Sequence, residues 1–450
     1  MKRHSLWVVG ANLLGPKRVN DEYHWRIHML GVRYTFRFAA ALLTTALLAT
    51  PSWAAQRTVD CTGATPNAYK SLQAAINSLG LIGPHVISVI NGSCTENVVI
   101  QDRQRLTITA VPNGAFIISA AGLDGNAMTI SGSTGITLIQ MGFSNGRNGL
   151  VVDRNSEVTV HGSTFSSNAA SGLRVLANST VSVDGAILNN GGNAVVAENS
   201  VLNILSSVVQ NNGGAEVFFR GSRGVFGSDQ VQNNSSGVVL VDGSSVIVHA
   251  PTLIQNNQSM GLAMFDGSSA DFPEDVDGNG NPIASVISGN AFIGINVLSA
   301  HAQVTGALQV TNNGFSGQLG HAGIRVDDNS SFVAAGTGDI SASGNSGPGI
   351  AAAAGGTMDL TGVIISNNSG DGINLQGNAQ VVIFPPNTNS LSGNGGASIR
   401  CDATSVFLGD PSGLNKVECR ITPFKDDAVS STSRRMLRET LDRDVPRRTK

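Results

Sequence analysis

A short signature that recurs about every 22 residues constrains this chain more than any other feature of its sequence. From residue 145 onward, one or two Asn are followed by about three small residues, then Gly, an apolar residue, any residue, and Val or Ile. Clear copies read SNAASGLRV at 167–175, NNSSGVVLV at 233–241 and NNSGDGINL at 367–375. Most spacings are 22 or 23 residues, and two are 33 and 32. The last Asn of each copy falls at Asn145, Asn168, Asn190, Asn212, Asn234, Asn257, Asn290, Asn313, Asn345, Asn368 and Asn394.

Each repeat contains three short stretches in which apolar and polar residues alternate, such as Val181-Ser182-Val183. Alternation is the period of a β-strand, so one repeat predicts one turn of a β-solenoid and not a helical repeat. The fixed Leu spacing of leucine-rich repeats is absent. We therefore predict an all-β chain of about ten coils whose inward Val, Ile and Leu stack into one core.

The recurring Asn has a structural explanation. Asn tolerates the left-handed conformation that a tight corner needs, and stacked Asn amides can hydrogen-bond along the solenoid axis as a ladder. We expect the repeated Asn to be structural residues rather than site residues.

The two ends of the chain differ from the repeats. Arg33 and Arg37 precede an apolar run at 38–49, and Ser52-Trp53-Ala54 offers small residues for cleavage, so residues 1–55 are predicted to be an export signal. The run is short for a membrane anchor, and we expect no membrane span after cleavage. Met29 stands where such a signal would begin and is the expected start. The mixed-charge stretch 421–450 is interpreted as a flexible tail, with a short exposed helix as the alternative.

All four cysteines, Cys61, Cys94, Cys401 and Cys419, follow the signal. An oxidising compartment, the periplasm or the extracellular space, would let them pair, and four cysteines allow three connectivities. We favour Cys61–Cys94 and Cys401–Cys419, which would fasten the two ends of the solenoid. Metal binding is the weaker interpretation because no pair has the Cys-x-x-Cys spacing.

The segment 56–141 is predicted to hold an N-terminal cap and the first coils. Residues 69–79 have helical periodicity, and an apolar strand, NGSCTENVVI at 91–100 and LTIT at 106–109 follow. This opening resembles that of pectin-lyase-like proteins, which include pectin methylesterases, and the coils at 142–420 resemble their repeats. The resemblance implies a right-handed parallel β-helix with an N-terminal capping helix. It implies no single chemistry, because that superfamily mixes lyases, hydrolases, esterases and non-catalytic proteins.

Enzymatic signatures of those relatives are missing from the sequence. We find neither the carboxylate pair with Arg of a pectin methylesterase nor the set of motifs of a polygalacturonase. Asp371, in NSGDGIN, is similar to one element of the latter, yet it belongs to the repeat and is interpreted as a corner residue. All three Trp lie within residues 1–53, so the remaining surface lacks these large amphipathic rings.

The charge balance bears on partners. Residues 142–400 hold 17 acidic residues, seven Arg and no Lys. Such a surface repels nucleic acid, and it repels uronic-acid polymers unless a cation bridges them.

The two long repeats are the strongest functional indication, because insertions in solenoids often build binding faces. One inserts residues 271–282, and the other expands around 314–322 and again before 344. Alignment of the coils places Asp242, Asp266 and Asp328 in one outward row, with Asp266 and Asp328 about 10 Å apart. We name Asp266, Asp327 and Asp328 as candidate catalytic acids.

The first insertion also suggests a cation site. Asp275-x-Asp277-x-Asn279-Gly280 is similar to the first half of an EF-type calcium loop, but Val286 stands where that loop needs Glu. The sequence leaves two interpretations, a soluble acidic turn or a calcium site formed by Asp275, Asp277 and Asn279.

Two functions follow from these observations. The first is an exported β-helix protein that binds a cell-envelope or extracellular glycan without a recognisable catalytic motif. The alternative is a polysaccharide lyase or glycoside hydrolase that acts through the acids near the insertions at 266–282 and 314–344. The sequence predicts no oligomeric state.

Overall fold

The computed structural model describes residues 54–111, 116–314, 321–335, 340–384, 389–411 and 414–422. The predicted export signal, the start at Met29 and nearly all of the predicted tail lie outside these residues. No helix in the described ranges is long and apolar enough to cross a bilayer.

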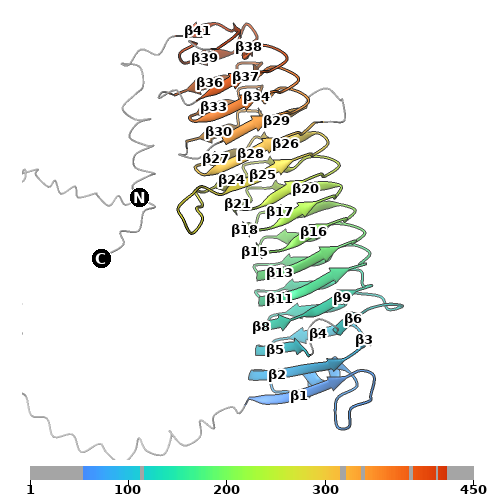
Figure 1. The fold of residues 1–450 in the computed structure, drawn as a ribbon. Helices are drawn as coiled ribbons and strands as arrows, with labels where there is room; N and C mark the ends of the chain where they lie inside the picture. Colours follow the sequence, from blue (N-terminus) through green and yellow to red (C-terminus); the bar gives the residue numbers. More distant parts are fainter. Residues whose placement is uncertain are drawn as a thin grey trace, which may run out of the picture. The chain divides into compact units, whose positions relative to one another are not determined.

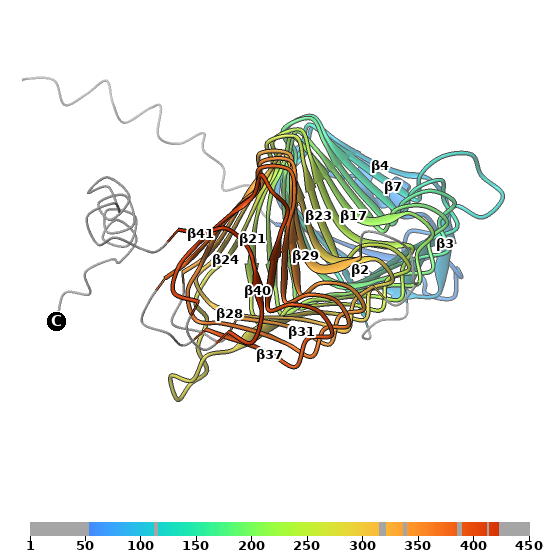
Figure 2. The ribbon, with the colours of Figure 1, turned by 90° about the horizontal axis from the view of Figure 1, so that it is seen from above.

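The described chain winds into a stack of parallel β-coils that rises in sequence order (Figure 1). Each strand pairs in parallel with the strand one coil later, so that Val195 lies beside Val217 and Val208 beside Gln230. Figure 2, viewed along the stack, shows three faces, exemplified by β24, β28 and β29. Faces 1 and 2 form one 27-stranded sheet that bends along β11 and β13, and face 3 is a separate 14-stranded sheet.

The strands of face 1, including the two bent strands, are β1 Ala55–Asp60, β2 Ile82–Asn91, β5 Gln104–Ala110, β8 Thr134–Ile139, β11 Glu157–Ser166, β13 Thr180–Leu188, β15 Val201–Leu205, β18 Arg223–Gly227, β21 Ser245–His249, β24 Ser269–Phe272, β27 His301–Val304, β30 Ser331–Ala334, β33 Thr357–Leu360, β36 Gln380–Ile383, β39 Val406–Leu408 and β41 Ile421–Thr422. The further strands of face 2 are β3 Ser93–Thr95, β6 Phe116–Ser119, β9 Met141–Ser144, β16 Val208–Gln210, β19 Gln230–Gln232, β22 Leu253–Gln255, β25 Ala284–Ser288, β28 Ala307–Thr311, β31 Ile340–Ser343, β34 Val363–Ser366 and β37 Ser390–Ser392. The strands of face 3 are β4 Val98–Gln101, β7 Met128–Ser131, β10 Leu150–Asp153, β12 Leu173–Leu176, β14 Val195–Glu198, β17 Ala215–Arg220, β20 Ser236–Val241, β23 Leu262–Phe265, β26 Ile293–Leu298, β29 Ala322–Asp327, β32 Ile350–Ala352, β35 Ile373–Leu375, β38 Ile399–Cys401 and β40 Val417–Glu418.

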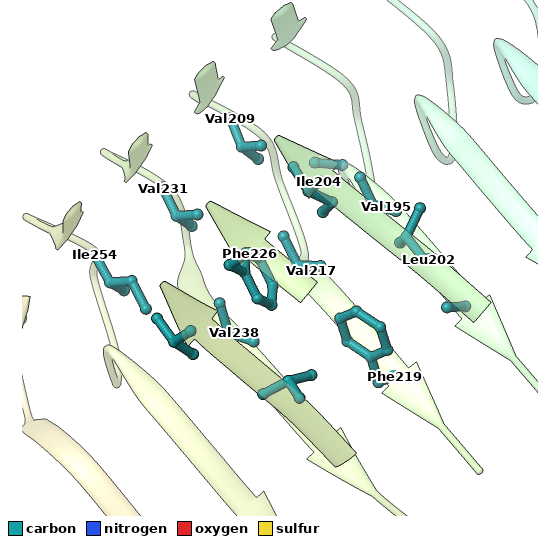
Figure 3. Close-up of a cluster of buried hydrophobic side chains, with 14 of the residues drawn as sticks. Val195, Leu202, Ile204, Val209, Val217, Phe219, Phe226, Val231, Val238 and Ile254 are labelled. Atoms are coloured by element: carbon teal, nitrogen blue, oxygen red, sulfur yellow. The ribbon is translucent and has the colours of Figure 1, made fainter. Parts of the chain in front are cut away.

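The core is the predicted column of inward aliphatic side chains. Leu202 and Ile204 of β15 are fully buried (Figure 3). Asn203 between them is partly exposed, as expected for a residue on the outer side of the strand. Phenylalanines join the column: the rings of Phe143 and Phe165 stack across one coil with centroids 5.0 Å apart. Since burial of apolar area contributes about 25 cal/mol per Å², this continuous column is the main stabilising element of the fold.

The predicted Asn ladder is present at the corner between faces 2 and 3. Asn168 Nδ2 donates to Asn190 Oδ1 at 2.9 Å, and the same contact recurs at most coils as far as Asn394. Between Asn234 and Asn257 the bond is donated by the Asn234 backbone N–H instead. Two details differ from the prediction. Asn145 stands one residue before the ladder position, which Gly146 occupies in that coil. The left-handed residue is the one that precedes each ladder Asn, such as Asn189 with φ 55°, because the corner and the ladder need different backbone shapes.

The number of coils exceeds the predicted ten, since face 3 alone stacks 14 strands. Of these strands, β4 and β7 precede residue 145 and β40 follows Asn394, and in both segments the Asn signature is absent, so the sequence gives no repeat to count.

The predicted helix at 69–79 is shorter in the structure. Helix α1 spans Leu72–Asn77, with Ser71 as its N-cap and with Leu72, Ala75 and Ile76 buried. Glu96 accepts hydrogen bonds from Ser71 Oγ and from the Leu72 N–H, both at 2.7 Å, which fixes the first turn. A capping role for this helix remains a prediction.

Both predicted disulfides form. Cys61 pairs with Cys94 near the start of the stack, and Cys401 pairs with Cys419 near its end, with Cα–Cα separations of 5.4 and 4.8 Å. Disulfides of this kind fit an exported protein.

Candidate functional site

A hollow of about 220 Å³ lies on the outer side of face 3. It sits over β32, between the outward side chains of β29 on one side and of β35 on the other. The residues that line it are His321, Arg325, Asp327, Pro348, Ala351, Ala352, Ala353, Asn374 and Gln376.

The hollow exists because one coil carries alanine at both outward positions of face 3. Strand register places Ala351 between Arg325 and Asn374 of the neighbouring coils. The same register, continued by two residues, places Ala353 between Asp327 and Gln376. Rungs of a parallel sheet are about 4.8 Å apart, so the two polar rows stand about 10 Å from each other across an alanine floor.

Asp327 forms one wall of the hollow, and one of its two carboxylate oxygens lacks a hydrogen-bond partner within the described chain. The Nε of Arg325 donates to Asp327 Oδ2 at 2.5 Å. The residue is 8% exposed, and within the described chain its Oδ1 has no hydrogen-bond partner. A buried acceptor left without a donor costs about 1–3 kcal/mol, and more when it is charged, so a donor brought to this carboxylate would be stabilising.

His321 borders the same hollow from the start of β29. The residue is buried, and its Nδ1 lies 2.7 Å from the carbonyl oxygen of Gly314. Because a carbonyl can only accept, Nδ1 carries the hydrogen of that bond. The ring also meets Phe292 edge to face, with centroids 5.7 Å apart. These contacts fix the orientation of the imidazole.

The opposite wall is held by a hydrogen-bonded chain. Gln376 Nε2 donates to Asn374 Oδ1 at 3.0 Å, and Asn374 Nδ2 donates to Asp371 Oδ2 at 2.8 Å. Asp371 also accepts from Arg400 Nε at 2.9 Å and from the Ala397 N–H at 2.7 Å. The corner role predicted for Asp371 therefore agrees with its contacts, and the residue also supports the wall of the hollow.

Asp266 and Asp328 lie elsewhere. Both are exposed at the corner between faces 3 and 1, in the left-handed conformation, with φ of 52° and 59°. Ser299 occupies the rung between them, and its hydroxyl donates to Asp328 Oδ2 at 2.5 Å. The predicted outward row of Asp242, Asp266 and Asp328 is therefore present, but Asp327 turns away from it into the hollow on face 3.

The first insertion leaves the stack at a third place. Residues 273–283 connect β24 to β25 at the corner between faces 1 and 2, where the loop projects in yellow-green in Figures 1 and 2. The structure thus does not bring this loop together with Asp266, Asp327 or Asp328, because the insertion and the acids belong to different corners of the coil.

The carboxylates of that loop accept hydrogen bonds from the chain itself. Asp275 accepts from the Ala250 N–H at 2.7 Å and lies 3.0 Å from His249 Nδ1. Asp277 accepts from the backbone N–H groups of Asn279 and Asn281 and from Asn281 Nδ2. These bonds lower the pKa of Asp277, the bonds from Asn281 most. Asn279 is exposed, and the structure directs Asp275 and Asp277 to different donors.

Among the described residues, the group of three His, Cys, Asp or Glu side chains close enough to share a metal ion is Cys61, Cys94 and Glu96. Its two sulfur atoms form a disulfide, and Glu96 binds the start of α1. The disulfide and the contact of Glu96 with α1 therefore explain why these three side chains lie close together.

Sequence reasoning identified Asp327 but missed the rest of the hollow. Arg325 belongs to one repeat, whereas Asn374 and Gln376 belong to another two coils later, and the three residues form no motif. The available signal was the run IAAAAGG at 350–356, which puts alanine where most coils carry larger outward residues.

Comparisons with known proteins agree with this architecture. Residues 126–305 match the family model described as right handed beta helix region. No curated protein matches the sequence.

Among solved structures, the chain is similar to the A-module of the mannuronan C-5 epimerase AlgE4 of Azotobacter vinelandii, with 15% identity, 78% of this chain and 95% of that chain covered, and a TM-score of 0.42. It is also similar to the DFA-IIIase of Arthrobacter chlorophenolicus, with 12% identity, 82% and 99% coverage and a TM-score of 0.42. A third similar structure is the pectate lyase Pel9A, with 13% identity, 64% and 78% coverage and a TM-score of 0.35. At identities this low, nothing of their activities is carried over. The strand pairing shows that the described chain is a parallel β-helix, and the family model for a right-handed β-helix matches residues 126–305 of it.

Proposed function

We propose that this protein is an exported β-helix that binds a glycan in the hollow over Ala351 and Ala353. The observation that carries the proposal is the pairing of two polar walls with an apolar floor on an open face. Sugars present hydroxyls at their edges and C–H groups on their faces, which is the complementary arrangement.

The walls supply both kinds of hydrogen-bonding group. The Asp327 carboxylate is an acceptor, while the guanidinium of Arg325 and the side-chain amides of Asn374 and Gln376 are sources of donors. Binding sites fix their ligands by a few such groups placed around an apolar surface.

Export is part of the proposal. The two disulfides support an oxidising compartment, and the apolar run at 38–49 supports a cleaved signal. The ligand would then belong to the cell envelope or the extracellular medium.

Binding is tested by isothermal titration of the mature chain with soluble oligosaccharides, after a screen on immobilised glycans. Ala351→Leu places a larger side chain in the hollow and should abolish binding without unfolding the protein, because Ala351 faces outward. Ala307→Leu is the matched control, since Ala307 is an outward alanine of a strand on face 2. Equal binding by wild type and Ala351→Leu would reject the hollow as the site.

A second function, a lyase or hydrolase, is favoured by one observation: His321 and Asp327 line the same hollow. Both side chains can exchange protons, as acid–base catalysis requires. An activity screen on polysaccharides, with and without calcium, tests this function. Loss of turnover in Asp327→Asn, but not in Asp266→Asn or Asp328→Asn, would support it. Equal turnover in wild type and Asp327→Asn would exclude Asp327 as the acid.

A further inference from the structure

We infer that the hollow selects an uncharged sugar unit that donates a hydroxyl to Asp327, and that it rejects uronic acids. This inference rests on the proposed glycan-binding function and specifies the ligand class of the same site. Three features of the hollow carry it: the unsatisfied oxygen of Asp327, the balance of charges around it, and its size.

The first feature sets the kind of group that can bind. Asp327 Oδ1 is buried and lacks a donor in the described chain. A sugar hydroxyl in the hollow can donate to the Asp327 carboxylate, and the bond would be made to a charged acceptor, which is the stronger class of hydrogen bond. A uronate carboxylate has no proton to donate, so it would place negative oxygen against negative oxygen.

The second feature removes the usual attraction for an anion. Arg325, the cationic side chain that lines the hollow among the described residues, is already paired with Asp327. Behind the other wall, Arg400 is paired with Asp371 at 2.9 Å and with Glu418 at 3.2 Å. A uronate would therefore lose water without gaining an unpaired positive partner among these groups.

The third feature limits how much of a glycan can enter. Pockets for drug-sized ligands measure about 300–1,000 Å³, and this hollow measures about 220 Å³. The polar rows face each other across a single alanine coil, so one ring fits between them. The hollow therefore accommodates one sugar unit, with the remainder of the glycan outside.

The test uses matched pairs of oligosaccharides that differ at the C6 group. Calorimetric titrations of the mature protein compare manno-oligosaccharides with oligomannuronates, and galacto-oligosaccharides with oligogalacturonates. We expect at least one uncharged member to bind at least tenfold more tightly than its uronate, with an affinity that is the same at 20 and 300 mM NaCl.

Asp327→Asn should weaken the uncharged ligand by about ten- to hundredfold, the loss of a hydrogen bond to a charged group. Asp266→Asn is the control, because it makes the same change at an exposed corner. Circular dichroism and the melting midpoint verify folding. If Asp327→Asn does not fold, Ala351→Leu should abolish the same binding without a change of charge.

The outcomes separate the inference from the proposed function. Tighter binding of either uronate, or unchanged binding of the uncharged sugar by a folded Asp327→Asn, would overturn the inference while glycan binding stands. No binding of any oligosaccharide would overturn both.

Discussion

Asn257 Nδ2 donates to Asn290 Oδ1 at 2.9 Å although 33 residues separate the two in sequence. The same bond, also at 2.9 Å, joins Asn168 to Asn190 across 22 residues. The ladder therefore keeps one register through the stack whatever the length of the coil between. The surplus residues of the 33-residue coil leave as the 273–283 loop, on another corner.

Loss of one amide side chain from the Asn ladder should lower the free energy of unfolding. Asn290 Oδ1 accepts from the N–H and the Nδ2 of Asn257, and Asn290 Nδ2 donates to Asn313 Oδ1 and to the Ile254 carbonyl. Asn290→Ala would leave several of these buried groups without partners, so we expect the free energy of unfolding to fall by about 2–4 kcal/mol. Chemical denaturation followed by circular dichroism measures this change.

The control for that variant is Asn203→Ala, which removes an amide from the outer side of β15 and should change stability by less than about 0.5 kcal/mol. Similar losses in Asn290→Ala and Asn203→Ala would contradict a structural role for the ladder.

The stack, the ladder and both disulfides could be predicted because each is local or repeated. The Asn signature recurs at the period of one coil, and every copy adds to the same inference. Where the signature is missing, before residue 145 and after Asn394, the count of coils failed. The separation of the left-handed corner from the ladder position was also missed, since Asn is common at both positions and the sequence pattern does not distinguish them.

The hollow could not be predicted in the same way. It depends on the small side chains of Ala351 and Ala353, and on polar residues that strand register brings from the two coils on either side of them. The sequence analysis placed the site near the insertions, which include the 273–283 loop. The sequence shows the length of an insertion but not the corner at which it leaves the coil.

Asp229 should make stability depend on pH. It is fully buried between face 1 and face 2, where its carboxylate accepts from the N–H groups of Ser207 and Gly227, both at 2.8 Å. Burial outweighs these bonds and raises the pKa of Asp229 from 3.8 to about 7. Between these values the unfolded chain releases the proton and the folded chain retains it, so stability falls as the pH rises from about 4 to 7, by about 4 kcal/mol in total.

Asp229→Ser tests this dependence. Serine already stands in the same column at Ser207, and its hydroxyl can still accept from a backbone N–H. Urea titrations from pH 4 to 8 should show a flatter pH profile for the variant and greater stability than wild type at pH 8. Parallel profiles for the two proteins would show that Asp229 does not titrate in this range.

Calcium should leave the thermal stability of the protein unchanged. An ion bound by Asp275 and Asp277 would have to compete with the hydrogen bonds that these carboxylates accept from Ala250, Asn279 and Asn281. Half of the EF-type ligand pattern is missing as well. Differential scanning calorimetry with 1 mM calcium or with a chelator measures the midpoint. A rise in midpoint with calcium that Asp277→Ala abolishes would instead establish the site.

The disulfide between Cys401 and Cys419 should act on the last coils alone. It joins β38 to the segment after β40 across 18 residues, a loop for which the chain-entropy model gives about 3 kcal/mol. In a solenoid each coil contacts its neighbours, so lost stability stays local. The double variant Cys401→Ser with Cys419→Ser should lose amide-exchange protection in β38–β41, whereas β12–β17 should keep theirs.

The matched control is Cys61→Ser with Cys94→Ser, which should move the loss to β1–β3. Because the two bridges lie near opposite ends of one continuous core, local effects of both would show that coils unfold from the ends inward. A uniform loss of protection along the stack in either variant would show instead that the whole solenoid unfolds as one cooperative unit, and a local role for the bridges would then be wrong.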